Sequence, residues 1–519
     1  MSTSEKGKRK LGGIKTVVYG RTAMILLGFL AQLVLLYVGY ILLSNYSYVT
    51  YVLFLAVSAV VVLYIFNAPG NPDMKLSWMF PIAIFPVFGA VFYLTIATQP
   101  GIKVMYARLK ALSEYTKKYV RPREEIKDRL WAEDHHMGQL AHYLERYDNS
   151  PVYDSAWVKY YSLGDSQFVD MVEELKKAEK YIFMEFFIVA EGRMLEEILA
   201  ILKEKAAGGV EVRFMYDGTN VLWNLPNSFP GFLEREGIRC KMFAPIKPVF
   251  SPHYNNRDHR KILVIDGRVA FTGGINLADE YINEKNRFGH WKDAGIMVKG
   301  DAVERFTYMF LEMWNESERA PENYGRYGLP ADAAMRKDGY VIPYSVCPLG
   351  LERVGERVYL DILSTAHSYV HIMTPYLILD YQMQVALTHA AKRGVEVIII
   401  MPHVPDKRYA FVLAKTYYNQ LLEAGVRICE YEPGFVHAKV FVSDDVKAVV
   451  GTVNLDYRSL YHHFECGLVL YRNSQVAVVE RDIQDTLKKC IEMNIEDYKK
   501  LKLTDRMLGR LMRIVAPLM

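Results

Sequence analysis

Long uncharged apolar runs are confined to the first hundred residues of the chain. Three of them span residues 22–44, 48–66 and 78–97, and each approaches the roughly 20 apolar residues that a helix needs to cross a bilayer. A cleaved signal peptide would explain the first run but not the two that follow it. The pattern therefore predicts a transmembrane segment over residues 22–98.

Basic residues flank this segment on both sides, in a tail over residues 1–21 and in a linker over residues 99–150. Because positive residues favour the cytoplasmic side of a membrane, two basic flanks indicate an even number of crossings, whereas three runs give an odd number. Pro81 and Pro86 interrupt the third run and leave open whether it crosses or is re-entrant. We expect the part of the chain after the segment to face the cytoplasm.

After residue 150 the pattern changes to short β-branched runs that alternate with helical periods. Tyr181–Val189 and Val210–Tyr216 have the composition of strands, and Met194–Ala207 between them has the period of a helix. This alternation is typical of an α/β fold.

The same rhythm then occurs a second time. The sequence Gly-Val-Glu-Val at 209–212 returns at 394–397, and the segment 233–240 returns as 421–428. A His-x-Lys triplet returns as well, and all three offsets are about 180 residues, so a duplication is indicated. We predict two tandem α/β repeats over 151–320 and 340–519, joined by a stretch rich in proline, glycine and charge.

Each repeat carries one His-x-Lys-x4-Asp unit followed by a Gly-x-x-Asn turn, with identical spacing. The residues are His259, Lys261, Asp266 and Asn276 in the first repeat, and His437, Lys439, Asp444 and Asn454 in the second. Residues two apart on a strand share a face, so each repeat presents an imidazole and an ammonium together. The turn returns the asparagine toward the histidine.

Two such sets around one phosphate suit phosphoryl transfer without a metal or a cofactor. One neutral imidazole attacks phosphorus, and the other, protonated, donates to the leaving oxygen. The lysines and amides neutralise the non-bridging oxygens. The two aspartates are candidate catalytic residues, but they stand at predicted hairpin turns, and a role in holding the hairpin is equally compatible with their position.

Composition and charge argue against a disulfide-stabilised protein, a cysteine-based metal site and a nucleic-acid-binding protein. The five cysteines are scattered, without a CxxC pair or a metal-ligand spacing, and their odd number precludes a complete set of internal disulfides. The net charge of +4 and the lack of a basic stripe with stacking aromatic residues argue against a nucleic-acid partner.

The doubled motif resembles the HKD motifs of the phospholipase D superfamily over residues 151–480. The resemblance implies a bilobal α/β fold with both motifs at the central interface. It also implies that His259 is the nucleophile and His437 the acid and base. Family members orient each histidine with a carboxylate further along the chain, and Asp293 and Glu465 are the candidates.

Within that superfamily the chain is most similar to bacterial cardiolipin synthases. The similarity lies in the segments 256–261, 273–281 and 451–459 and in the apolar N-terminal hairpin with Trp78 and Gly89. His463 departs from the pattern, because these enzymes often have asparagine there, and so does the extra apolar run.

This similarity implies transfer of a phosphatidyl group between two phosphatidylglycerol molecules, by a multi-pass enzyme of the bacterial plasma membrane, with no nucleic-acid partner. The residues would serve a hydrolytic phospholipase D or another transphosphatidylase equally well. The protein partners, the second substrate and the order of the two histidines stay open. A final stretch, 501–519, mixes apolar and basic residues and suits either an anionic bilayer or a packing helix.

Overall fold

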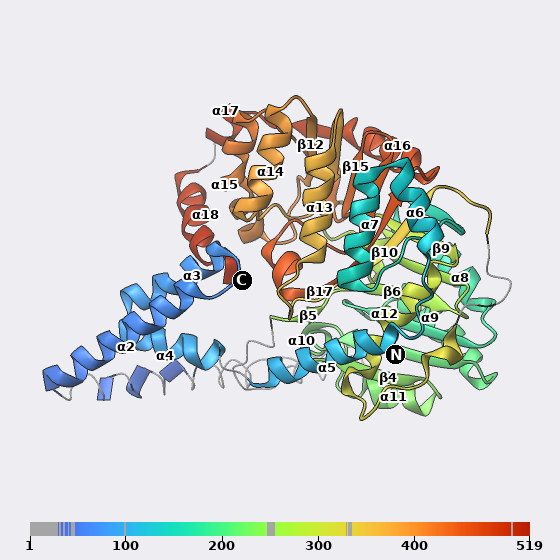
Figure 1. Ribbon diagram of the computed structural model, residues 1–519, viewed down its shortest axis with the longest axis horizontal. Coiled ribbons are helices and arrows are strands. Elements are labelled where there is room, and N and C mark those ends of the chain that lie inside the picture. The colour runs from blue at the N-terminus through green and yellow to red at the C-terminus, as the bar shows by residue number, and fades with distance from the viewer. Residues whose placement is uncertain are drawn as a thin grey trace, which may run out of the picture.

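The computed structural model describes residues 47–518 apart from 98–99, 246–254, 329, 331–334 and 500–501, together with scattered positions between 30 and 42. It forms two α/β lobes, with a group of N-terminal helices extending away from them (Figure 1). The predicted tail over 1–21 and most of the first apolar run lie outside the described residues.

The first lobe is built on a seven-stranded mixed sheet in which helix α9 connects two parallel strands. In sheet order the strands are β1 (Ala156–Tyr161), β9 (Gly295–Gly300), β7 (Val269–Gly273), β6 (Lys261–Ile265), β2 (Tyr181–Phe186), β3 (Glu211–Asp217) and β4 (Arg239–Phe243). Its helices are α8 (Gly164–Lys176), α9 (Arg193–Ala207), α10 (Asn220–Trp223), α11 (Phe229–Arg235) and α12 (Val303–Trp314). The central strands are buried on both faces, which explains their continuous apolar runs.

The second lobe repeats this plan, as the duplicated sequence predicts. In order, its strands are β10 (Tyr340–Val346), β17 (His463–Tyr471), β16 (Lys447–Gly451), β15 (Val440–Ser443), β11 (Tyr369–Met373), β12 (Glu396–Pro402), β13 (Arg427–Tyr431) and β18 (Cys490–Glu492). The helices are α13 (Val354–Thr365), α14 (Tyr381–Lys392), α15 (Arg408–Glu423), α16 (Gln475–Leu487) and α17 (Ile495–Lys499). The first seven strands match those of the first sheet one for one.

A shared core joins the lobes. Apolar residues of both sheets, such as Val264 and Val442, pack with residues of α12, such as Phe310, and of α16, such as Val479, in one buried cluster. Separate cores lie on the outer side of each sheet, under α8 and α9 in the first lobe and under α13 to α15 in the second. The two sheets therefore face one another across α12 and α16, which fixes the place where their strand ends meet.

The segment 99–150, expected as a basic linker, is folded onto both lobes. It forms α5 (Pro100–Thr116), α6 (Glu124–Glu133) and α7 (His135–Asp148). Helix α5 packs on α12 of the first lobe, and α7 packs on α13 and β10 of the second. The segment is a structural brace between the lobes.

The N-terminal helices α2 (Ser47–Asn67), α3 (Pro72–Ile84) and α4 (Pro86–Ala97) pack on one another. The third apolar run is divided between α3 and α4, because α3 ends just before Pro86. The close approach of these two helices needs Gly89, where a Cβ would stand 2.7 Å from the Ile82 Cα. No helix in the described part of the chain combines the length and the apolar composition that a membrane span requires.

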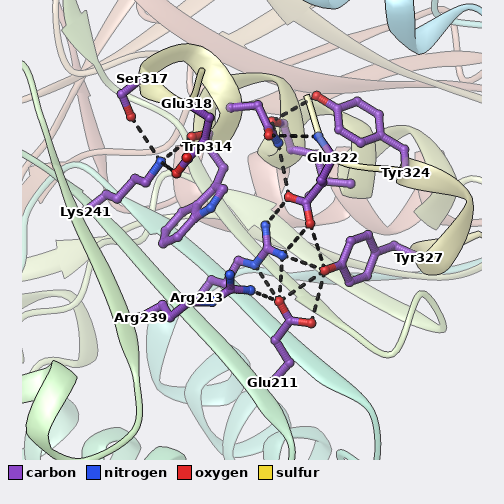
Figure 2. Close-up of polar contacts among 12 residues, drawn as sticks. Glu211, Arg213, Arg239, Lys241, Trp314, Ser317, Glu318, Glu322, Tyr324 and Tyr327 are labelled. Carbon is purple, nitrogen blue, oxygen red and sulfur yellow. Dashed lines mark hydrogen bonds and ion pairs between the residues drawn. The ribbon is translucent and has the colours of Figure 1, made fainter. Parts of the chain in front are cut away.

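The connection between the lobes is held to the edge of the first sheet by a charged network (Figure 2). Arg213 of β3 is almost fully buried and donates to Glu322 at 2.7 Å and to the Glu211 carboxylate at 2.6 Å. Tyr327 bonds to both carboxylates from the other side. Because a buried guanidinium needs its partners, this network fixes the start of the connection.

Candidate active site between the lobes

Two short parallel ladders cross from one lobe to the other and position the histidines. Strand β5 (Arg257–Asp258), which leads into His259, pairs with the beginning of β17 in the second lobe. Strand β14 (Gly434–Val436), which leads into His437, pairs with β8 (His290–Lys292) of the first lobe. The backbone N–H of His259 donates to the Phe464 carbonyl at 2.9 Å, and that of His437 to the Lys292 carbonyl at 2.6 Å.

These ladders pair each histidine with a carboxylate of the other lobe. His259 Nδ1 lies 2.8 Å from Glu465 Oε2, and His437 Nδ1 lies 2.7 Å from Asp293 Oδ2. All four side chains are buried. Both carboxylates expected from the sequence are thus at the site, and each orients the histidine of the opposite repeat, with Nε2 left to face a substrate.

Each lysine donates to the backbone carbonyl of its own motif histidine. Lys261 Nζ does so to His259 at 2.5 Å, and Lys439 makes the equivalent bond to His437. Burial lowers the pKa of Lys261 to about 8 and that of Lys439 to about 7. Two buried ammonium groups without full compensation attract an anion such as a phosphodiester.

Burial also sets the state of the imidazoles. Burial, with the Lys261 charge, lowers the pKa of His259 well below its usual value. Burial and the Lys439 charge lower the pKa of His437 to about 4. Although burial works against it, His437 and Lys439 lower the pKa of Asp293, whereas burial raises the pKa of Glu465. The Asp293 carboxylate is therefore ionised and able to stabilise an imidazolium at His437.

His463 lies directly beside His259, with ring centroids 5.3 Å apart. Its Nε2 accepts from Arg458 Nε at 3.1 Å, so its Nδ1 carries the proton and faces Glu465 Oε1 at 3.6 Å. Glu465 thus stands between two imidazoles. In the described part of the chain, His259, His463 and Glu465 form the one group of three whose donor atoms are spaced closely enough for a metal ion. The hydrogen bond of His259 to Glu465 already uses one of those donors.

The two asparagines differ in their contacts. Asn276 accepts from the Ile188 N–H at 2.9 Å and donates to the Tyr281 hydroxyl at 2.8 Å, and the Tyr281 ring lies 5.3 Å from His437. The Oδ1 of Asn454 is buried and has no partner among the described residues. Asn276 therefore holds the hydroxyl of a tyrosine whose ring packs against the opposite histidine.

Asp266 and Asp444, counted among the catalytic candidates, are not at the site. The Asp266 carboxylate accepts three backbone N–H bonds, from residues 179–181, at 2.7 to 2.8 Å. Asp444 accepts the same three from residues 367–369. Each stands in a hairpin turn with a left-handed backbone, at φ 54° for both, and binds the start of the neighbouring strand. Their role is to hold the hairpin, because they sit at the far end of the strand from the histidine.

Several residues at the site carried no separate signal in the sequence. Phe187 packs edge-on against the His259 ring at 4.8 Å, and the Trp291 indole N–H donates to Asp293 at 3.4 Å. Tyr281 and Arg458 are the others. Both lie in the segments 273–281 and 451–459 that resemble the family, but their residue types alone did not indicate a place beside the histidines. Arg260, between the two motif residues of the first repeat, points away from them and donates to Glu185 at 2.6 Å behind the site.

Comparison with known proteins places this arrangement in a family context. A family model described as "Cardiolipin synthase, PLD-like domain" matches residues 171–314 and 359–487, one block in each lobe. A second, described as "Phospholipase_D-nuclease N-terminal", matches residues 54–97.

Two relatives match most of this chain and most of their own length. An uncharacterized protein of Streptococcus mutans is 47% identical over 88% of this chain and 99% of its own length. A cardiolipin synthase of Halalkalibacterium halodurans is 33% identical over 88% of this chain and 91% of its own. Among solved structures, a phosphatidylserine synthase of Haemophilus influenzae covers 70% of this chain and 93% of its own, with a TM-score of 0.50 and 15% identity, a likeness of fold alone.

Proposed function

The chain belongs to the phospholipase D superfamily, among its cardiolipin synthase-like members, and we propose from this premise that it is a cardiolipin synthase. It is a phospholipid transferase of the phospholipase D type. The finer proposal is that two phosphatidylglycerol molecules give cardiolipin and glycerol. The crossed pairing of each motif histidine with a carboxylate of the other lobe carries the mechanism.

In the first half-reaction, His259 Nε2 attacks the phosphorus of one phosphatidylglycerol. The bond from phosphorus to the glycerol oxygen breaks, and His437 supplies the proton that this oxygen takes. Lys261 and Lys439 neutralise the non-bridging oxygens. Burial lowers the pKa of both imidazoles, so both are neutral before the reaction and either could act as a nucleophile. The difference lies in their partners: the lowered pKa of Asp293 keeps a carboxylate beside His437 that can stabilise an imidazolium there, whereas burial raises the pKa of Glu465 beside His259.

In the second half-reaction, His437 takes the proton from a hydroxyl of the acceptor lipid. The hydroxyl oxygen attacks the phosphatidyl-histidine, the phosphorus–nitrogen bond breaks, and His259 is restored. Aromatic side chains pack against both histidines, Phe187 against His259 and Tyr281 and Trp291 against His437, and we propose that this apolar lining favours an alcohol over water as the acceptor. We propose that the N-terminal segment attaches the enzyme to the bacterial plasma membrane as a multi-pass anchor, with the catalytic lobes on the cytoplasmic side.

The test uses purified protein reconstituted with phosphatidylglycerol alone, and mass spectrometry reads the product lipids. Cardiolipin and glycerol are expected from the native enzyme and neither from His259→Ala. Phosphatidic acid in their place would mean that water is the acceptor and that the enzyme is a hydrolase. The absence of turnover, with phosphatidylethanolamine also present, would remove the proposed substrate.

A further inference from the structure

A cavity of about 600 Å³ opens between α3, the second lobe and the C-terminal helix α18 (Leu503–Val515), which lies beside α3 (Figure 1). The wall that α3 contributes is apolar, with Leu76, Met79 and Phe80. None of the catalytic candidates is among the described residues that line it. The cavity is therefore distinct from the catalytic cluster.

The opposite wall of the cavity is cationic. Arg513 stacks over the Tyr417 ring at 4.4 Å and donates to Gln384 at 3.2 Å, which hold its guanidinium in place. Arg510 also lines the cavity, is exposed, and has no hydrogen bond or ion pair within the described part of the chain.

Among the residues that the structure describes, the cavity is lined by one carboxylate, that of Asp73 on α3, and two guanidinium groups, which leaves a net positive charge. Asp73 already accepts from the Tyr457 hydroxyl at 2.8 Å and from the Tyr381 N–H at 3.1 Å. The acid on α18, Asp505, pairs with Arg408 of α15 at 2.9 Å. The cavity therefore combines an apolar wall with a net positive one, a combination that is complementary to an anionic amphiphile.

The surroundings of the cavity point to a lipid. Helix α18 buries Gly509 against α15 and leaves Leu503, Met507 and Leu511 more than half exposed. Apolar side chains exposed beside arginines are typical of a helix that lies in the plane of an anionic bilayer. Helix α2, which packs on α3, exposes a further row of aliphatic side chains. Of these helices, α18 lines the cavity itself, and α2 packs on α3, which forms another of its walls.

We propose that this cavity is a binding site for an anionic phospholipid, separate from the catalytic cluster. The phosphate lies between Arg510 and Arg513, and an acyl chain lies along Leu76, Met79 and Phe80. A lipid bound there holds α3 and α18 together against the second lobe. The site requires only an anionic headgroup with acyl chains, so it does not depend on which phospholipid the catalytic site converts.

The experiment is native mass spectrometry of the full-length protein, purified in detergent and carrying His259→Ala so that no lipid is turned over. Phosphatidylglycerol and phosphatidylcholine with the same acyl chains are titrated in parallel. The Arg510→Gln/Arg513→Gln variant removes the cationic wall, and Ala83→Trp fills the apolar side. Arg319→Gln, an exposed arginine distant in sequence, is the matched control.

We expect the parent and the control to bind one more phosphatidylglycerol than the double variant does, or to bind it about tenfold more tightly, as for a lost charge-assisted hydrogen bond. Ala83→Trp should weaken the same binding event, and phosphatidylcholine should fill the site poorly. Unchanged phosphatidylglycerol binding in both variants would overturn the proposal. So would equal binding of the two lipids, or displacement by inorganic phosphate alone, which would indicate an anion site without a lipid. Because no turnover is measured, these outcomes are independent of the proposed reaction.

Discussion

Each motif histidine pairs with a carboxylate of the opposite repeat, so mutating a carboxylate should affect the histidine of the other repeat. Pairing within each repeat would predict the opposite result. Glu465→Gln should impair His259, and Asp293→Asn should impair His437, although each mutated residue lies in the opposite repeat. Each substitution alters one buried hydrogen bond between a carboxyl group and an imidazole, worth about 1–3 kcal/mol, which corresponds to a rate loss of about five- to a hundredfold. It also allows the unproductive tautomer, which raises the loss further.

The assay distinguishes the nucleophilic role of His259 from the acid role of His437 by using a substrate whose leaving group needs no proton. Phosphatidyl-p-nitrophenol releases nitrophenolate without needing a proton, so the first step then depends on His259 but not on an acid at His437. We expect Asp293→Asn to give a near-normal burst of nitrophenol and then to accumulate the phosphohistidine, because the acceptor lacks a base. Glu465→Gln should show a slow burst and no accumulation.

Two further measurements make this result decisive. His437→Ala should behave like Asp293→Asn in the burst assay. Mass spectrometry of the acid-sensitive adduct, quenched in base, should locate the phosphatidyl group on His259. A slow burst for Asp293→Asn and a normal one for Glu465→Gln, with the adduct still on His259, would refute the crossed assignment.

Four other outcomes follow from the same contacts. Asp266→Ala should lower the free energy of unfolding by about 2–4 kcal/mol, because three backbone N–H groups lose the carboxylate that accepts from them. Turnover per folded molecule should stay unchanged. Chemical denaturation measures the stability, and active-site titration gives the number of folded molecules for the turnover. His463→Asn should keep activity within about tenfold, because it keeps a polar group beside the buried Glu465 carboxyl group. His463→Leu should lose about tenfold or more in kcat, because an apolar side chain then faces that carboxyl group; comparable activity in the two variants would argue against this role. Lys439→Met should abolish activity yet raise the free energy of unfolding by about 2–4 kcal/mol at neutral pH. The reason is that burial lowers the pKa of Lys439 from 10.5 to about 7 in the folded protein, so the charged lysine destabilises the fold. This gain should disappear as the pH of the unfolding experiment rises from 7 to 10.5. Glu322→Gln should lower the free energy of unfolding by about 3 kcal/mol at neutral pH, because Arg213 lowers the pKa of Glu322 from 4.5 to about 2 although burial would raise it. The stabilities of the native protein and the variant should converge as the pH falls from 4.5 to 2. A difference that does not depend on pH would contradict the ion-pair explanation.

Much of the fold and the site chemistry follows from local pattern. The repeat, the strand at 181, the helix at 194 and the Asp266-Gly267 turn were all predicted, because the side-chain period and the turn residues act over a few positions. The doubled His-x-Lys unit likewise indicates its chemistry through residue type and spacing. Position along the chain could not decide the role of Asp266, since the same turn suits a hairpin clasp or a catalytic carboxylate.

The sequence by itself indicated the two His-x-Lys units and the two carboxylates that meet at the site, and the tertiary structure alone decided how they pair and that Asp266 and Asp444 lie away from it. His259 and Glu465 are 206 residues apart, and His437 and Asp293 are 144 apart. Their partnership is set by the ladders of β5 with β17 and of β14 with β8, which exist because α12 and α16 hold the two sheets face to face. The bracing role of 99–150 and the cavity beside α18 were likewise decided by the tertiary structure, because the apolar face of a helix shows that it packs but not which distant element it packs against.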